Sequence, residues 1–140
     1  MNLIPPADVI SGAVILATVV AGLILSMIIV AVEGVALRLL RWAGLWRSLA
    51  DSVIANVASA VVGLAGAILV PALLSAIVKA TVVPLLVGSF LVSTVIEAGV
   101  IALIRRRPLR EAVGPFAAAN AASHVLILAL ILTAGSAGSA

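Results

Sequence analysis

Four side chains able to bind a proton or a cation stand within otherwise apolar stretches of this sequence: Glu33, Asn56, Glu97 and Asn120. Carboxylates and amide oxygens are the ligands that hard cations prefer, and a carboxylate also accepts a proton. An ionisable group inside an apolar helix costs roughly 3 kcal/mol on membrane-insertion scales, and such groups commonly mark ion or proton pathways. The four residues therefore predict a polar site for a proton or cation.

The spacing of these residues indicates an internal duplication. Glu33 and Glu97 are 64 positions apart, and so are Asn56 and Asn120. The same offset relates three further pairs, which are Arg41 and Arg105, Leu45 and Leu109, and Ser59 and Ser123. Matches among rare polar residues carry weight in so apolar a chain, so we predict two repeats, at about 9–78 and 81–133.

The composition restricts the class of protein. Of 140 residues, 65% are hydrophobic and 9% are charged, with a mean hydropathy of +1.43. An ordinary soluble domain is about half apolar and about a quarter charged. This balance excludes a soluble enzyme, a disordered tail and a nucleic-acid binder despite the pI near 11.2, and favours an integral membrane protein. The absence of cysteine excludes disulfides and thiolate metal sites.

Four apolar stretches reach the roughly 20 residues that a membrane-spanning helix needs. They cover residues 9–32 (apolar as far as 37 apart from Glu33), 52–78, 81–104 and 111–133. We predict an all-α integral membrane four-helix bundle in one domain, 1–140, with a flexible tail at 134–140. Two tandem helical hairpins would form parallel repeats, related by a pseudo-twofold axis along the membrane normal. Pro71 is expected to kink the second helix, and Pro115 to lie in the first turn of the fourth.

Seven of the eight basic residues lie in two links between these stretches, and Lys79 lies on the opposite side. The seven are Arg38, Arg41, Arg47, Arg105, Arg106, Arg107 and Arg110. The positive-inside rule predicts that both links face the cytoplasm and both termini face outward, in the cytoplasmic membrane if the source is prokaryotic. The start of the chain has no basic region, which argues against a cleaved signal peptide. Trp42 and Trp46 alternate with arginines in the first link, which is typical of a segment anchored among lipid headgroups.

The four polar residues are expected at similar depths, where they can form a ring across the bundle. They have polar neighbours at helical spacing, namely Ser59, Ser93, Ser123 and His124. If His124 faced Glu97, the two could relay a proton, although a lone histidine is more often a hydrogen-bonded core residue. The ring also has a purely structural interpretation, because Asn and Glu hydrogen bonds fix helix register at roughly 1 kcal/mol each.

These observations support two hypotheses about function. One is a small transporter or channel for a cation or proton, with the ring as its site. The other is a non-catalytic accessory or assembly subunit of a larger membrane complex. The expected partners are the lipid bilayer and either further copies of the chain or other membrane subunits, with no nucleic acid. No nucleophile–base set indicates an enzyme, no Glu-x-x-His spacing indicates a metal centre, and the sequence indicates no particular cofactor.

Overall fold

The computed structural model describes residues 7–69 and 82–137, and all regular structure in these ranges is α-helical. The helices are α1 (Ala7–Leu39), α2 (Leu45–Leu69), α4 (Val82–Arg105) and α5 (Leu109–Ala137). Each is long and apolar enough to cross a membrane, which confirms the predicted all-α class and its four membrane-length helices. Pro71 and Lys79 lie outside the described residues.

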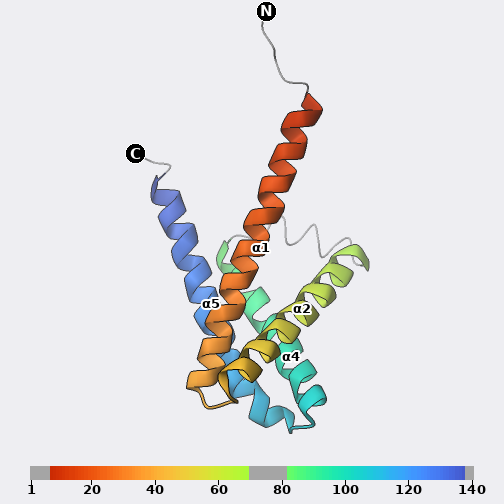
Figure 1. Ribbon diagram of the computed structural model, residues 1–140, viewed down its shortest axis with the longest axis vertical. Helices are drawn as coiled ribbons and strands as arrows, with labels where there is room; N and C mark the ends of the chain where they lie inside the picture. Colours follow the sequence, from red (N-terminus) through yellow and green to blue (C-terminus); the bar gives the residue numbers. More distant parts are fainter. Residues whose placement is uncertain (1–6, 70–81, 138–140) are drawn as a thin grey trace, which may run out of the picture.

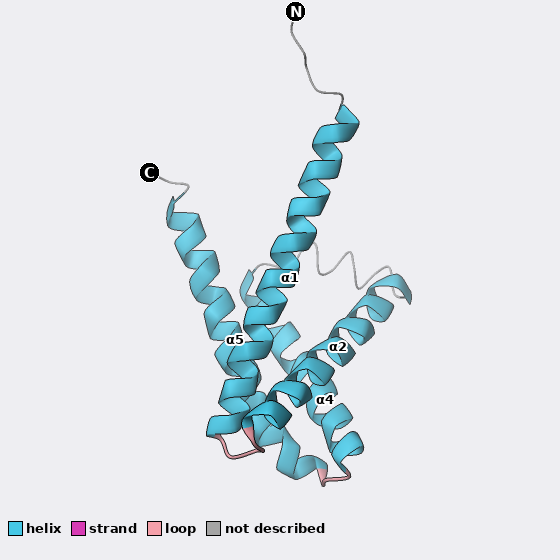
Figure 2. Cartoon of the chain, in the orientation of Figure 1, coloured by secondary structure: helices cyan, strands magenta, loops and turns pink. Residues whose placement is uncertain are grey.

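The four helices pack in a ring, in which α1 and α4 each contact both α2 and α5. The start of α1 and the end of α5 lie at one end of the molecule, and the two described links lie at the other (Figures 1 and 2). The helices converge toward the links and separate toward the opposite end.

The buried core lies in the half of the bundle near the links. Its hydrophobic members are Leu37, Trp42, Ala55, Ala98, Ile101, Ala102, Ala112, Phe116 and Ala119. By contrast, every residue of α1 from Gly12 to Ile28 is exposed except Leu25, which is half-buried. Tertiary packing within the chain is therefore concentrated at the level of Glu33 and below it, toward the links.

Two helices begin earlier than the apolar pattern predicts. α2 starts at Leu45 and not at residue 52, and α5 starts at Leu109 and not at residue 111. The apolar pattern identifies only the apolar segment of each helix. Backbone hydrogen bonding continues the helix into the more polar residues that precede this segment. Pro115 consequently lies in the second turn of α5 and not in the first, so it cannot donate to the carbonyl of Glu111. At its other end α5 continues to Ala137, past the expected limit at residue 133.

The two links leave their helices through the same turn. Arg41 has a φ of 59° and Arg106 a φ of 51°, so both are left-handed. Directly after Arg41 in the chain, the Trp42 N–H donates to the Leu37 carbonyl at 3.0 Å. The Arg107 N–H donates to the Ala102 carbonyl at 2.9 Å in the same way. These are Schellman motifs, whose left-handed position is usually glycine because a Cβ is disfavoured there.

This geometry predicts that Arg106→Gly stabilises the protein relative to Arg106→Ala by about 1 kcal/mol. Both variants lose the guanidinium, but only glycine removes the Cβ from the left-handed position. The measurement is the free energy of unfolding in mixed detergent micelles. Equal stability of the two variants would contradict the strained turn.

Close contact between α1 and α2 depends on Gly34, which is buried. A Cβ added there would lie 2.5 Å from Leu49 Cδ2 and 3.0 Å from Leu49 Cα. The second neighbour is a backbone atom, so a change of side-chain rotamer cannot remove the clash. In lipid such close approach matters because helix association depends on packing and not on a hydrophobic driving force.

Gly34→Ala should therefore push α1 away from α2 and destabilise the bundle by about 1–3 kcal/mol, the usual cost of overpacking. Gly99→Ala is the matched control, because a Cβ at Gly99 meets nothing within 4 Å. That variant should be neutral or slightly stabilising, since alanine has the higher helix propensity. Thermal unfolding in detergent compares the two, and the prediction fails if Gly34→Ala is as stable as Gly99→Ala.

Candidate functional site: a buried carboxylate pair

Glu33 of α1 accepts three side-chain hydrogen bonds inside the bundle, and only 2% of its surface is exposed. Ser123 Oγ on α5 donates to Oε1 at 2.8 Å. Ser52 Oγ on α2 donates to Oε2 at 3.1 Å, and the Asn56 amide donates to the same oxygen. Two neighbouring helices therefore hold this carboxylate.

Glu97 of α4 is bound in a closely similar way and is also 2% exposed. The Asn120 amide on α5 donates to Oε2 at 2.7 Å, and Ser59 Oγ on α2 donates to Oε1 at 3.1 Å. Glu33 and Glu97 are hereafter the carboxylate pair. Each member accepts a hydrogen bond from one asparagine and from at least one serine.

Two serines link the halves of this network. Ser123 Oγ lies 3.0 Å from the backbone oxygen of Asn120, whose side chain holds Glu97, while it also bonds Glu33. Ser59 Oγ lies 3.1 Å from the backbone oxygen of Asn56, whose side chain holds Glu33, and it also bonds Glu97. The structure therefore joins all four members of the predicted ring, together with these two serines.

The carboxylate pair has no basic partner among the described residues. The single ion pair in the described ranges joins Arg105 to Asp51. Nor do three His, Cys, Asp or Glu side chains converge on a metal-binding group within the described part of the chain. Buried charges are costly unless they are neutralised, so the pair requires protons or a bound cation as counter-charge.

No family model matches this chain, and no curated protein or solved structure matches it either.

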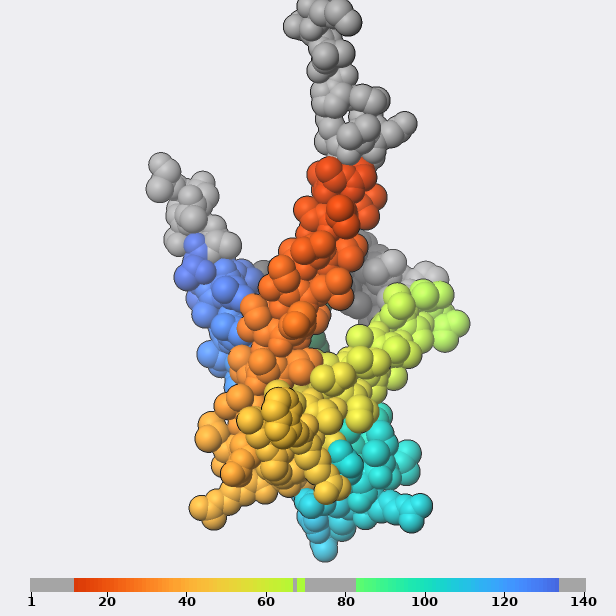
Figure 3. Space-filling model, in the orientation of Figure 1, coloured from red at the N-terminus to blue at the C-terminus, as the bar shows by residue number. Residues whose placement is uncertain are grey.

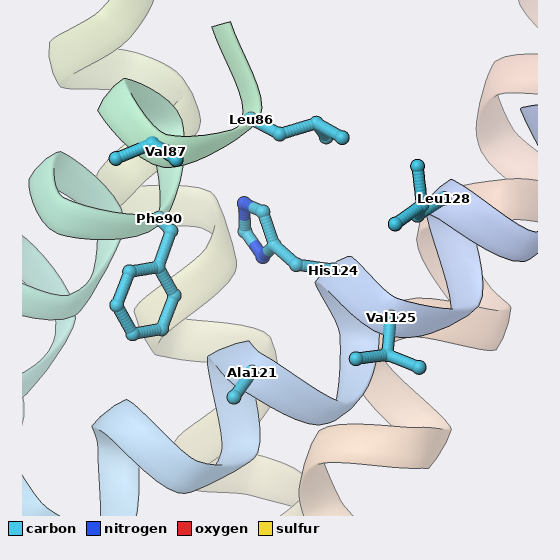
Figure 4. A pocket seen from close by; sticks show the side chains of 7 residues that line it. All are labelled: Leu86, Val87, Phe90, Ala121, His124, Val125 and Leu128. Carbon is cyan, nitrogen blue, oxygen red and sulfur yellow. The ribbon is translucent and has the colours of Figure 1, made fainter. Parts of the chain in front are cut away.

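Within the described ranges, His124 forms hydrogen bonds with residues other than Glu97. Its Nδ1 lies 2.8 Å from the Asn120 backbone oxygen, and its Nε2 lies 3.1 Å from Ser89 Oγ on α4. The ring also meets Phe90 edge-on at 5.7 Å. Figure 4 shows the imidazole reaching from α5 toward α4, at the edge of the bundle. It lines an open groove of about 300 Å³ together with Leu86, Val87, Phe90, Ala121, Val125 and Leu128.

The arginines and tryptophans predicted at the membrane surface fall into two groups. Trp46 is 82% exposed, as a headgroup anchor should be. The exposed arginines are Arg38, Arg41, Arg47, Arg106, Arg107 and Arg110. Trp42 and Arg105 differ, because Trp42 is 7% exposed and Arg105 is half-buried against Asp51.

The sequence interpretation missed Asp51, which is the centre of a buried cluster near the links. Arg105 Nε donates to its Oδ1 at 3.0 Å, and Trp42 Nε1 donates to its Oδ2 at 2.9 Å. The Trp42 ring meets the Phe116 ring edge-on, with 5.6 Å between the ring centroids. The Arg107 guanidinium lies 4.7 Å from the centroid of the Trp42 ring. The cluster ties the two links to α2 and α5. Asp51 has no polar counterpart at the offset of 64, where Pro115 stands, so the duplication could not reveal it.

Asp51→Asn should destabilise the bundle by about 2 kcal/mol, because it leaves a half-buried guanidinium without its carboxylate. Glu111→Gln is the matched control, since Glu111 is exposed in the first turn of α5. Its cost should stay below about 1 kcal/mol, the contribution of one charge at a helix N-terminus. Unfolding in mixed micelles measures both, and equal losses would mean that the Asp51–Arg105 ion pair contributes no stability of its own.

Proposed function

We propose that the chain is a small membrane transporter or channel for a proton or small cation, with the carboxylate pair as its binding site. The observation that carries this proposal is the burial of two carboxylates, each held by hydroxyl and amide donors, without a basic partner among the described residues. A site held together only for packing has no need of two ionisable groups, because paired amides would make comparable hydrogen bonds.

The chemistry of the donors agrees with this proposal. Hydroxyl and amide hydrogens stabilise the negative carboxylates, while the uncompensated charge attracts a cation to the site. Serine hydroxyls and asparagine amides also carry oxygens, which suit hard cations in preference to zinc or iron. Transport also requires release, and neutral oxygen ligands favour exchange over permanent binding.

We also propose that the chain arose by duplication of a helical hairpin. The contacts support this, because Asn56 bonds Glu33 while Asn120, 64 positions later, bonds Glu97. The hydrogen bonds between the two halves also correspond, because Ser59 bonds Glu97 while Ser123, 64 positions later, bonds Glu33. In this proposal a pseudo-twofold axis along the membrane normal passes between the carboxylates, and the site lies where the two repeats meet.

The proposed orientation keeps both arginine-rich links in the cytoplasm and the termini outside. Its support is the position of six exposed arginines in or beside the two links, at one end of the bundle. The positive-inside rule assigns such an end to the cytoplasmic face.

The test is ion or proton flux into proteoliposomes containing the purified protein. Glu97→Gln and Glu33→Gln should each reduce flux at least tenfold, because glutamine keeps the size and hydrogen-bonding capacity of the side chain but loses its charge. Glu111→Gln makes the same chemical change at an exposed position and should leave flux unchanged. Unchanged flux in both ring variants would refute the proposal.

A second candidate function is that of an accessory or assembly subunit. The observation that favours it is α1, whose residues Gly12–Ile28 pack against almost nothing in the described part of the chain. Ala13, Ala17 and Ala21 form an exposed ridge there, and such ridges let another membrane helix approach closely. Under this alternative, the purified protein has no flux of its own and co-purifies with other membrane subunits. Assembly of further copies of this chain on α1 is instead compatible with transport.

A further inference from the structure

A recess of about 360 Å³ lies beside the carboxylate pair, between α1, α2 and α4. It is lined by Ser26, Ile29, Val30, Val53, Asn56, Val57, Ser59, Ala60 and Ser93. Two of these residues, Asn56 and Ser59, also hydrogen-bond the carboxylates. At roughly 30 Å³ for each molecule, the volume accommodates on the order of ten waters.

Two adjacent hydroxyls on α4, one of them on the wall of the recess, make no hydrogen bond to a described residue. Thr94 is 7% exposed, and its Oγ1 has no hydrogen-bond partner within the described ranges. Ser93 lines the recess and likewise makes no side-chain hydrogen bond to any described residue. Serines and threonines in apolar helices normally bond the carbonyl four residues earlier, as Thr18 does at 2.9 Å and Ser26 at 2.8 Å. The Ser93 hydroxyl, one turn before Glu97 and on the wall of the recess, is therefore available to water or to an ion, whereas the Thr94 hydroxyl is buried beside it.

The recess extends from the level of the carboxylates toward one end of the bundle. Ser26 precedes Glu33 on α1, and Ser93 precedes Glu97 on α4, so both lie on the side where α1 begins. Figure 3 shows α1 and α2 diverging toward that end, with an open space between them. At the other end, the core residues and the Asp51–Arg105 ion pair fill the space between the helices.

From these features we propose that the recess is a water-filled vestibule through which a small hydrated monocation, hydronium included, reaches the carboxylate pair. The inference rests on the proposed function, and it adds the route and the end of the molecule from which the ion arrives. Ser26, Ser93 and Asn56 replace part of the hydration shell as the ion approaches. The negative pair makes the vestibule selective for cations over anions.

The absence of cysteine makes the vestibule directly testable, because any introduced cysteine is the only thiol. Ser93→Cys and Ser26→Cys place thiols on opposite walls. Val95→Cys is the control on the outer face of α4, where the side chain is 70% exposed. The probes are a cationic and an anionic methanethiosulfonate reagent, both membrane-impermeant, added to proteoliposomes or to intact cells.

In a water-filled vestibule, the cationic reagent should modify Ser93→Cys at least tenfold faster than Val95→Cys, and faster than the anionic reagent does. Ser26→Cys is a second, independent variant that keeps the test valid if Ser93→Cys misfolds locally. It should be modified in the same way. Modification should also reduce flux at least tenfold if the vestibule is the route. Rates no faster than at Val95→Cys for both thiols overturn the vestibule, and rapid modification with unchanged flux overturns the route.

Competition experiments identify which cation is transported. Protection of Ser93→Cys by sodium, potassium or lithium at fixed pH indicates a metal cation, whereas flux driven by a pH gradient alone, without such protection, indicates the proton. Failure of the underlying function is separately recognisable, because the unmodified protein would then show no flux, or the Glu33→Gln and Glu97→Gln variants would retain it, whatever the labelling rates.

Discussion

Two carboxylates in an apolar bundle impose the constraint on which the rest of this structure depends. Lipid offers no hydrogen-bond donors, so Glu33 on α1 and Glu97 on α4 must find theirs within the protein. Every side chain that donates to them belongs to α2 or α5. All four helices must therefore meet at one level, where Gly34, next to Glu33, packs closely against Leu49 of α2. Above this level the helices are free to separate, as they do.

The sequence predicts the helices and the members of the ring because both signals are strong against this background. Apolar length identifies a membrane helix, and a rare polar residue stands out when 65% of the chain is hydrophobic. The sequence cannot predict the Asp51–Arg105 ion pair or the burial of Trp42, because each depends on partners distant in the chain. Pro115 shows a similar limit, since hydrogen bonding and not hydropathy decides where α5 begins. For His124, helical spacing indicates a face of α5 but not the neighbour that the ring meets.

The offset of 64 positions holds at the ring but fails at the links. It pairs Arg41 with Arg105, yet the left-handed residues of the two turns are Arg41 and Arg106. In the second half of the chain, one more residue separates the glutamate from the left-handed residue of the turn than in the first half. One fewer residue then separates that turn from the asparagine. The spacing from glutamate to asparagine is 23 in both cases. This pattern is expected if the hydrogen bonds at the carboxylates limit variation more tightly than the turns do, because a slip of one residue rotates a helical side chain by about 100°.

The two ends of the bundle differ in a way that bears on the proposed transport of an ion. The end near the links is closed by core packing and by the Asp51–Arg105 ion pair. Asp51 is followed directly by Ser52, which donates to Glu33. A movement of this turn of α2 that separates Asp51 from Arg105 therefore also displaces Ser52 relative to Glu33. In the proposed transporter, opening toward the links would therefore be coupled to weakening of a donor at the carboxylate pair through two adjacent residues. The proposed function requires such coupling, because a transport site must change as the path beyond it opens.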